Sequence, residues 1–297
     1  MEQASTHIAT ARYSKFTGFV RLTKIRLGGL VVFSAIISYL TVATTYDWQQ
    51  ILGVLAGGFL VTGAANGLNQ VIEAERDKLM DRTRERPIPL EILSPSESLW
   101  FCILTGIAGT VILWALANPL AGLLGFLSIV LYAGIYTPMK AVSPFSVFVG
   151  AFPGALPTLI GTVAATSGFG EITFFGVLLF AIQFVWQFPH FWSLAWFNAE
   201  DYAKGGFYLL PSRGGKDHFT RFQILLYSAF LLLVSIFPFV FHFTGLVSTV
   251  AVMLCGLALF LQAFNFYRLG TDDAARKLFL ITLIYLPLVQ VALMTKA

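Results

Sequence analysis

The chain has 297 residues, of which 57% are hydrophobic and 11% are charged, and its net charge is +4. The charged share is roughly half that of an ordinary soluble domain. A soluble core of this size cannot hide so much apolar surface, whereas a lipid bilayer can accommodate it. The composition therefore excludes a soluble globular protein. It predicts an all-α integral membrane protein, with residues 1–297 forming a single domain.

Nine apolar runs are long enough to cross a bilayer, which takes about 20 residues each. They begin near Arg26, Ile51, Leu99, Leu120, Phe145, Ile172, Phe222, Leu246 and Leu278. The connections on one side are short. On the other side two long segments, 73–98 and 198–220, follow the second and sixth runs. We therefore predict nine transmembrane helices, with cytoplasmic cap loops after helices 2 and 6.

Basic residues mark one side of the membrane. With nine spans, all of the 19 lysines and arginines except Lys296 fall in the N-terminal segment or in the loops after spans two, four, six and eight. Basic loops stay on the cytoplasmic side, so residues 1–25 are expected to be cytoplasmic, in a bacterial inner membrane. The matrix side of a mitochondrial inner membrane is the alternative. This asymmetry explains the positive net charge without nucleic acid as a partner.

The first group of polar residues follows the second apolar run. Asn69, Glu73 and Asp77 are spaced four apart, so on a helix they form one stripe that rises about 12 Å. Asp81 extends the stripe if the helix continues. Like charges at this spacing repel, and a hard divalent cation such as Mg²⁺, which prefers oxygen ligands and phosphate, would explain the array. The alternative is a helix end that leaves the membrane with a salt-bridged, solvated face.

Cationic and aromatic side chains gather near the same predicted membrane surface. Two arginines follow the acidic stripe, and arginine suits bidentate contact with phosphate. A YTPMK sequence ends the fourth run, and two basic residues precede or open the first. Together they predict a site for an anionic phosphate and its metal. The candidate binding residues are Lys24, Arg26, Arg82, Thr83, Arg86, Tyr136 and Lys140.

A second polar group lies on the sixth run and just beyond it. Gln183, Gln187, His190, Asn198 and Asp201 fall within about 60° of one line on a continuous helix, although Pro189 can kink it. Polar groups at membrane depth usually face the bundle interior and mark a substrate path. The alternative is that these side chains hydrogen-bond neighbouring helices.

The loop beyond the sixth run resembles a lid that covers a headgroup. It begins DYAKGG and therefore brings Tyr202 and Lys204 next to Asp201. We expect these two side chains to contact the substrate.

Four motifs carry a specific resemblance. They resemble the UbiA-type intramembrane prenyltransferase superfamily, and most closely its protoheme IX farnesyltransferase branch. The match covers nearly the whole chain. The motifs are NQxxExxxDxxMxRTxxRP at 69–87, GAFPGALPTLIG at 150–161, PHFWSLAW at 189–196 and DYxxGGFYLLP at 201–211.

The resemblance implies a fold of nine helices in the lipid bilayer and a reaction between farnesyl diphosphate and heme b that gives heme O and pyrophosphate with Mg²⁺. It implies that Asn69, Glu73 and Asp77 bind diphosphate through Mg²⁺, and that Asp201 holds a second metal or steadies the developing charge. A heme A synthase or another heme-pathway membrane protein is a candidate partner. The residues implied to grip the phosphates are Lys24, Arg82, Arg86 and Lys140.

The sequence departs from the family pattern in several places. Glu73 stands where many members have Asp, and Gly205 stands where the second motif often has another Asp. Ala141 and Ser146 replace an Arg and an Asn, and Ile25 stands where Pro is frequent. These departures bear on the site more than on the family. Two other functions stay open: prenylation of a quinone precursor or other aromatic acceptor, and transport of an anionic metabolite.

Overall fold

A computed structural model of the chain describes residues 14–212 and 214–295. Within these residues nine helices are long and apolar enough to cross a membrane, which confirms the predicted all-α fold and its number of spans. Each begins close to the position expected from the apolar runs, except the last, which begins six residues earlier. The spans are α3 (Ile25–Val42), α4 (Trp48–Ile72), α6 with η1 (Pro95–Ala117), α7 with η2 and α8 (Pro119–Met139), α9 (Ser146–Ala164), α10 (Phe174–Phe197), α12 with α13 (His218–Val240), α14 (Leu246–Leu269) and α15 (Asp272–Ala292).

Side-chain caps explain where several spans begin. Ser94 accepts a hydrogen bond from the backbone N–H of Glu97, whose carboxylate accepts one from the Ser94 N–H, and Pro95 opens α6. This capping box satisfies N–H groups that a helix start leaves without partners. Other spans begin with the same chemistry, because a short polar side chain caps the first turn. These caps are Asp47, Asn118, Thr173, Asp217 and Thr271.

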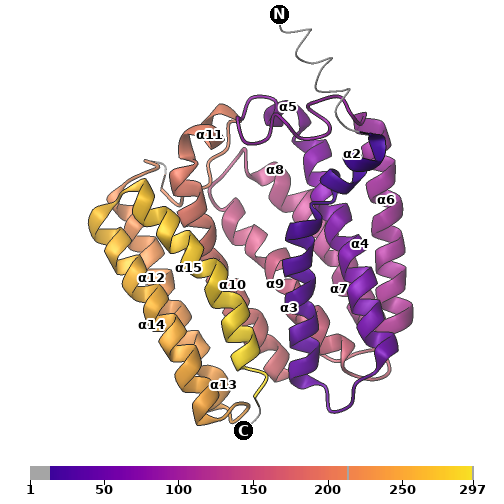
Figure 1. Ribbon diagram of the computed structural model, residues 1–297, viewed down its shortest axis with the longest axis vertical. Helices are drawn as coiled ribbons and strands as arrows, with labels where there is room; N and C mark the ends of the chain where they lie inside the picture. Colours follow the sequence, from indigo (N-terminus) through magenta and orange to yellow (C-terminus); the bar gives the residue numbers. More distant parts are fainter. Residues whose placement is uncertain (1–13, 213, 296–297) are drawn as a thin grey trace, which may run out of the picture.

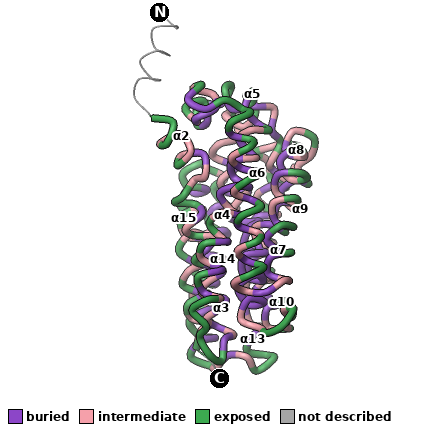
Figure 2. The backbone as a smooth tube through the Cα atoms, turned by 90° about the vertical axis from the view of Figure 1, so that its right-hand side faces the viewer, coloured by how far each residue is buried: buried purple, intermediate pink, exposed green. Residues whose placement is uncertain are grey.

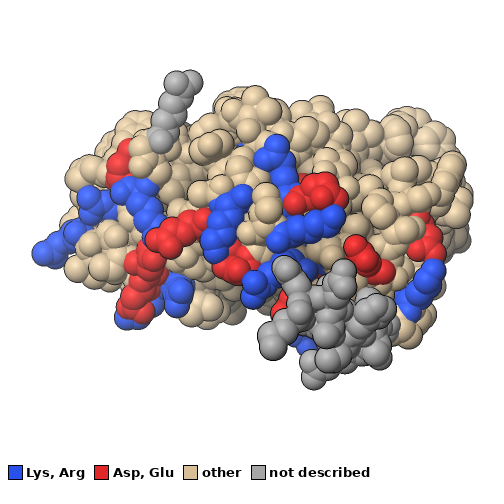
Figure 3. All heavy atoms as spheres, turned by 90° about the horizontal axis from the view of Figure 1, so that it is seen from above, with Lys and Arg blue, Asp and Glu red and all other residues tan. Residues whose placement is uncertain are grey.

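Short helices gather at one end of the bundle (Figure 1). They are α2 (Lys15–Leu22), α5 (Ala74–Asp77) and α11 (Ala199–Lys204). The segments after the second and sixth spans therefore reach the same end of the molecule, whereas α15 ends at the opposite one. Seen from this end, acidic and basic side chains cover much of the face (Figure 3). The charged residues predicted from sequence are thus collected at this end, whereas Gln183, Gln187 and His190 are buried on α10.

Burial varies among the spans, as the colours in Figure 2 show. In its most apolar stretch, α9 has 78% of its residues buried, compared with 22% in the span that contains α6. α9 contributes Val147 and Ala151 to a core with α10, α12, α14 and α15, and Leu156 and Ile160 to a core with α3, α4 and α7. It therefore joins the two halves of the bundle.

Close backbone contact fixes α9 against α3. A Cβ added at Gly161 would lie 1.9 Å from the carbonyl oxygen of Ala35, so only glycine fits there. α9 also contains Pro153 and Pro157, which interrupt helix hydrogen bonding and are tolerated in spans that neighbours enclose. This packing anchors the helix that follows Lys140.

Candidate active site

The acidic stripe forms as the spacing predicts. Although α4 ends at Ile72, the N–H of Glu73 donates to the carbonyl oxygen of Asn69 at 3.0 Å, and the N–H of Asp77 to that of Glu73 at 2.8 Å. The helical spacing therefore continues across the joint between α4 and α5. Asn69, Glu73 and Asp77 are 2%, 4% and 0% exposed. The helix stops at Asp77, so Asp81 does not extend the stripe and is exposed.

Each carboxylate of the stripe is paired with a cation. Lys140, which follows α8, forms an ion pair with Glu73, and both side chains are buried. Arg86 donates to the Asp77 carboxylate at 2.6 Å. Asn69 donates to the hydroxyl of Thr137 at 3.1 Å. The repulsion expected from the spacing is thus offset by two cations, one of them contributed by a distant span.

One carboxylate oxygen of this group has no partner among the described residues. Oδ1 of Asp77 is buried without a hydrogen bond, and burial raises the pKa of Asp77 above its ordinary value although Arg86 opposes the shift. A buried lone pair of this kind fits a hard cation. No group of three His, Cys, Asp or Glu in the described residues is arranged to hold a metal by itself. A metal here would therefore take further ligands from Asn69, water or phosphate.

Four cationic side chains surround the stripe, namely those of Lys24, Arg82, Arg86 and Lys140. Their total positive charge exceeds the negative charge of the two carboxylates, Glu73 and Asp77. Burial, together with the positive charges of Arg86 and Lys140, lowers the pKa of Lys24 to about 7. Burial also lowers the pKa of Lys140, against the opposing effect of Glu73. Lys24 has a left-handed backbone (φ 51°) at the joint between α2 and α3, and Arg82 also acts on it electrostatically. Crowded cations of this kind favour a multiply charged anion.

Aromatic rings support these cations. The guanidinium of Arg82 lies 5.2 Å from the ring centroid of Tyr202, and Nζ of Lys140 lies 5.0 Å and 5.2 Å from those of Tyr136 and Phe207. At such distances the ring quadrupole stabilises a positive charge. Tyr202 and Phe207 also line an adjacent, mostly apolar cavity of about 510 Å³. The predicted residues Tyr136, Lys140 and Tyr202 therefore lie together.

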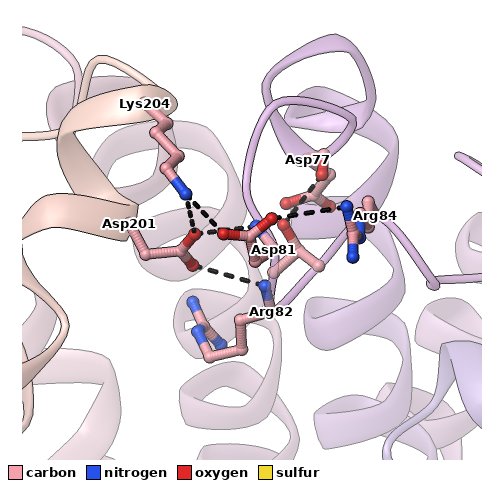
Figure 4. A network of polar contacts seen from close by, with 7 residues as sticks. Asp77, Asp81, Arg82, Arg84, Asp201 and Lys204 are labelled. Carbon is pink, nitrogen blue, oxygen red and sulfur yellow. Dashed lines mark hydrogen bonds and ion pairs between the residues drawn. The ribbon is translucent and has the colours of Figure 1, made fainter.

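Asp201 and Lys204 join the two long loops (Figure 4). The Asp201 carboxylate accepts the backbone N–H of Asp81 at 2.7 Å and that of Arg82 at 3.3 Å. Lys204 pairs with Asp81, which also lies 3.4 Å from Arg84. In this structure Asp201 holds α11 against the loop after α5, while Asp81 and Lys204 form an exposed bridge above it.

The remaining predicted residues of this rim take different positions. The Thr83 hydroxyl donates to the carbonyl oxygen of Asp77 at 2.9 Å and so closes the loop onto α5. Arg26 is exposed on α3. Arg76, which the sequence reasoning missed, donates to the carbonyl oxygen of Gly205 at 2.8 Å and lies over Phe207. Its position inside the 69–87 motif was the only signal.

The polar residues of α10 divide into two groups. Gln183 and Gln187 donate to the carbonyl oxygens of Gly154 and Ala151 on α9, so both bond a neighbouring helix, as His190 also does. His190 has its Nδ1 2.8 Å from the Thr282 hydroxyl of α15. Because α10 ends at Phe197 and Asp201 belongs to α11, the predicted continuous stripe is interrupted at Asn198.

Solved structures share this fold. A digeranylgeranylglyceryl phosphate synthase has a TM-score of 0.78 at 18% identity, with 94% of this chain and 97% of that chain covered. A UbiA homologue from Archaeoglobus fulgidus bound to DMAPP and Mg²⁺ has a TM-score of 0.65 at 13% identity, with 93% and 98% covered. At these identities the similarity shows the fold alone.

Sequence relatives are closer. The protoheme IX farnesyltransferase of Cytophaga hutchinsonii is 41% identical over 280 residues, covering 94% of this chain and 97% of the relative. That of Christiangramia forsetii is 40% identical over 293 residues, covering 97% and 96%. The sequence pattern of the UbiA prenyltransferase family matches residues 30–285. The chain therefore belongs to the UbiA prenyltransferase family.

Proposed function

We propose that this enzyme transfers the farnesyl group of farnesyl diphosphate to heme b, giving heme O and diphosphate in the presence of Mg²⁺. The observation that supports it most is the buried pair of Glu73 and Asp77, set among Lys24, Arg86 and Lys140 at one end of a membrane bundle. Relatives at about 40% identity over nearly the whole chain are named protoheme IX farnesyltransferase, which supports heme b as the acceptor.

The chemistry needs a stabilised leaving group. When the allylic C–O bond breaks, both electrons leave with the diphosphate, so positive groups placed around it lower the barrier. Mg²⁺ held by Asn69, Glu73 and Asp77 would supply part of that charge. Lys24, Arg82, Arg86 and Lys140 would bind the phosphate oxygens. The allylic cation, shielded from water, is then captured by the π electrons of a heme vinyl group. The new carbocation on the acceptor is discharged by one water molecule, which adds its oxygen and releases a proton, so heme b, farnesyl diphosphate and water give heme O and diphosphate.

A product assay tests this function. The full chain in lipid nanodiscs is incubated with farnesyl diphosphate, Mg²⁺ and heme b, and mass spectrometry is expected to detect a farnesylated heme. A parallel reaction contains an aromatic quinone precursor instead of heme. Farnesylation of the quinone precursor without farnesylation of heme would contradict the heme assignment and leave the prenyltransferase activity intact.

We infer that the end bearing α5 and α11 is cytoplasmic, in a bacterial inner membrane, because the basic loops lie there. A heme A synthase in that membrane is a candidate partner to receive the product. Reporter fusions check the orientation: a phosphatase fused after Lys140 is expected to be inactive, whereas one fused at the C-terminus is expected to be active outside the cytoplasm. Activity at both positions, or at neither, contradicts this topology.

A further inference from the structure

The same side chains that would bind metal and phosphate bind each other in this structure. Glu73 pairs with Lys140, and Asp77 pairs with Arg86 at 2.6 Å. The side chains of Glu73 and Asp77 are 5% and 0% exposed, and those of Lys140 and Arg86 are 10% and 16% exposed. These contacts therefore differ from surface salt bridges, which water screens and which contribute little.

Buried pairs constrain how ligands enter. A divalent cation that takes the two carboxylates leaves two buried cations without counter-ions, and an uncompensated buried charge is strongly unfavourable. A diphosphate that takes Lys140 and Arg86 alone leaves the carboxylates unpaired in the same way. If metal and diphosphate arrive together, both original pairs are exchanged for two new ones and no charge is left alone.

We propose that Lys140 and Arg86 serve as internal counter-ions of Glu73 and Asp77, so that the divalent metal and the diphosphate each bind tightly only when the other is present. The proposal rests on the proposed function for the identity of the two ligands. It assigns both cations a second role, because they hold the metal ligands in place before substrate arrives. By thermodynamic linkage, the metal must strengthen diphosphate binding by the same factor as the diphosphate strengthens metal binding.

The geometry also explains why the two ligands are coupled through particular residues. Lys140 comes from the turn after α8, whereas Glu73 lies at the joint between α4 and α5, so their pair connects two separate spans. Arg86 comes from the loop that Asp201 and Thr83 hold down. Exchange of the two pairs therefore requires only side-chain movement around carboxylates whose backbone is already fixed.

Metal binding to the full chain tests this without turnover. Mn²⁺, a hard cation that also accepts oxygen ligands, is titrated by electron paramagnetic resonance in detergent, alone and with inorganic pyrophosphate. After correction for the complex in solution, pyrophosphate is expected to tighten Mn²⁺ binding to the wild type at least tenfold. In Lys140→Met, binding of Mn²⁺ alone is expected to be at least tenfold tighter than in the wild type, and the further effect of pyrophosphate is expected to shrink.

Matched variants distinguish the counter-ion role of Lys140 and Arg86 from a general effect of removing a positive charge. Lys216→Met removes a cation from the half-exposed pair with Asp272 and is expected to leave Mn²⁺ binding unchanged. Arg86→Gln repeats the test at Asp77 and decides the matter if Lys140→Met does not fold. The proposal is overturned if pyrophosphate fails to tighten Mn²⁺ binding to the wild type, or if a folded Lys140→Met variant binds Mn²⁺ no more tightly.

The outcome is independent of the acceptor. If Mn²⁺ and pyrophosphate are coupled and Lys140→Met binds Mn²⁺ alone more tightly, but no farnesylated heme forms, the proposed function fails and the counter-ion role stands. If farnesylated heme forms while Mn²⁺ and pyrophosphate bind independently, the counter-ion role fails and the function stands.

Discussion

Glu73→Gln and Asp77→Asn are each expected to lower the rate of farnesyl transfer at least about a thousandfold, which corresponds to a loss of ~4 kcal/mol of transition-state stabilisation. Each change keeps the size of the side chain and removes the charge that a divalent metal needs. Oδ1 of Asp77 has no partner in the described residues, so this residue should be the more sensitive. Single-turnover measurements with farnesyl diphosphate, Mg²⁺ and heme b would give the rates.

Two aspartates calibrate this loss. Asp273 lies in an exposed pair with Lys277, so Asp273→Asn is expected to retain full activity. Asp81→Asn tests a residue that sequence reasoning placed among the metal ligands and that the structure shows exposed, beside Lys204 and Arg84. We expect less than a tenfold loss, because its partners can be screened by water. A loss of activity as large as that of Asp77→Asn would indicate that Asp81 is a metal ligand after all.

Stability must be followed in the same variants. Glu73→Gln leaves Lys140 buried without its counter-ion, which is typically costly, so thermal unfolding in detergent should occur at a lower temperature. The double variant Glu73→Gln with Lys140→Met removes both charges and is expected to recover stability without recovering activity. If the double variant recovers both, the loss in the single variant reflects misfolding and the metal assignment is wrong.

The fold was largely predictable because a bilayer imposes a length. Each span needs about 20 apolar residues, and the charged loops between them are read directly from the chain. The start of α15 was missed because Asp272, Asp273 and Lys277 lie in its first turns, before the apolar run begins. The helix starts at the Thr271 cap, which composition alone does not reveal.

The parts of the site that could be predicted are those whose residues lie close together in the sequence. Asn69, Glu73 and Asp77 follow from a spacing of four on one helix, and the structure keeps that spacing. The pair of Glu73 with Lys140 joins residues 67 positions apart, so no periodicity indicates it. The partner of His190 is Thr282, 92 residues away on the last span. Such contacts depend on how spans pack, which hydropathy does not specify.

We propose His190 as the residue of α10 that meets the heme. Its ring stacks between Trp186 and Phe279, with centroids 4.5 Å and 4.8 Å away. The Thr282 hydroxyl lies 2.6 Å from the carbonyl oxygen of Phe279 and 2.8 Å from Nδ1 of His190. When its single proton goes to that carbonyl oxygen, the hydroxyl accepts from Nδ1 of His190. This arrangement corresponds to the Nδ1–H tautomer, in which the Nε2 lone pair, in the plane of the ring, is left for an iron ion or a proton.

We therefore expect His190→Ala to abolish the spectral change that heme b causes on binding to the wild type, and to lower farnesyl transfer at least a hundredfold. Pyrophosphate-dependent Mn²⁺ binding should survive, because the contacts of His190 are with Trp186, Phe279 and Thr282, none of which belongs to the group around Glu73 and Asp77. Thr282→Val keeps the side-chain volume but frees the tautomer, and is expected to show a smaller loss in both measurements. Difference spectra and thermal melts of the three proteins provide the comparison.

A competing location for the acceptor is the cavity of about 510 Å³ beside Tyr202 and Phe207. Its volume lies in the range of ligand pockets, and Ala199 lines it.

Ala199→Trp would fill this cavity without touching His190. If heme binds there, Ala199→Trp blocks the spectral change while His190→Ala leaves it intact. If His190 ligates the iron, the two variants give the opposite results. A third result would make His190 a packing residue. In that case His190→Ala loses heme binding and Mn²⁺ binding equally and melts at a lower temperature, because only general unfolding of the bundle affects both sites.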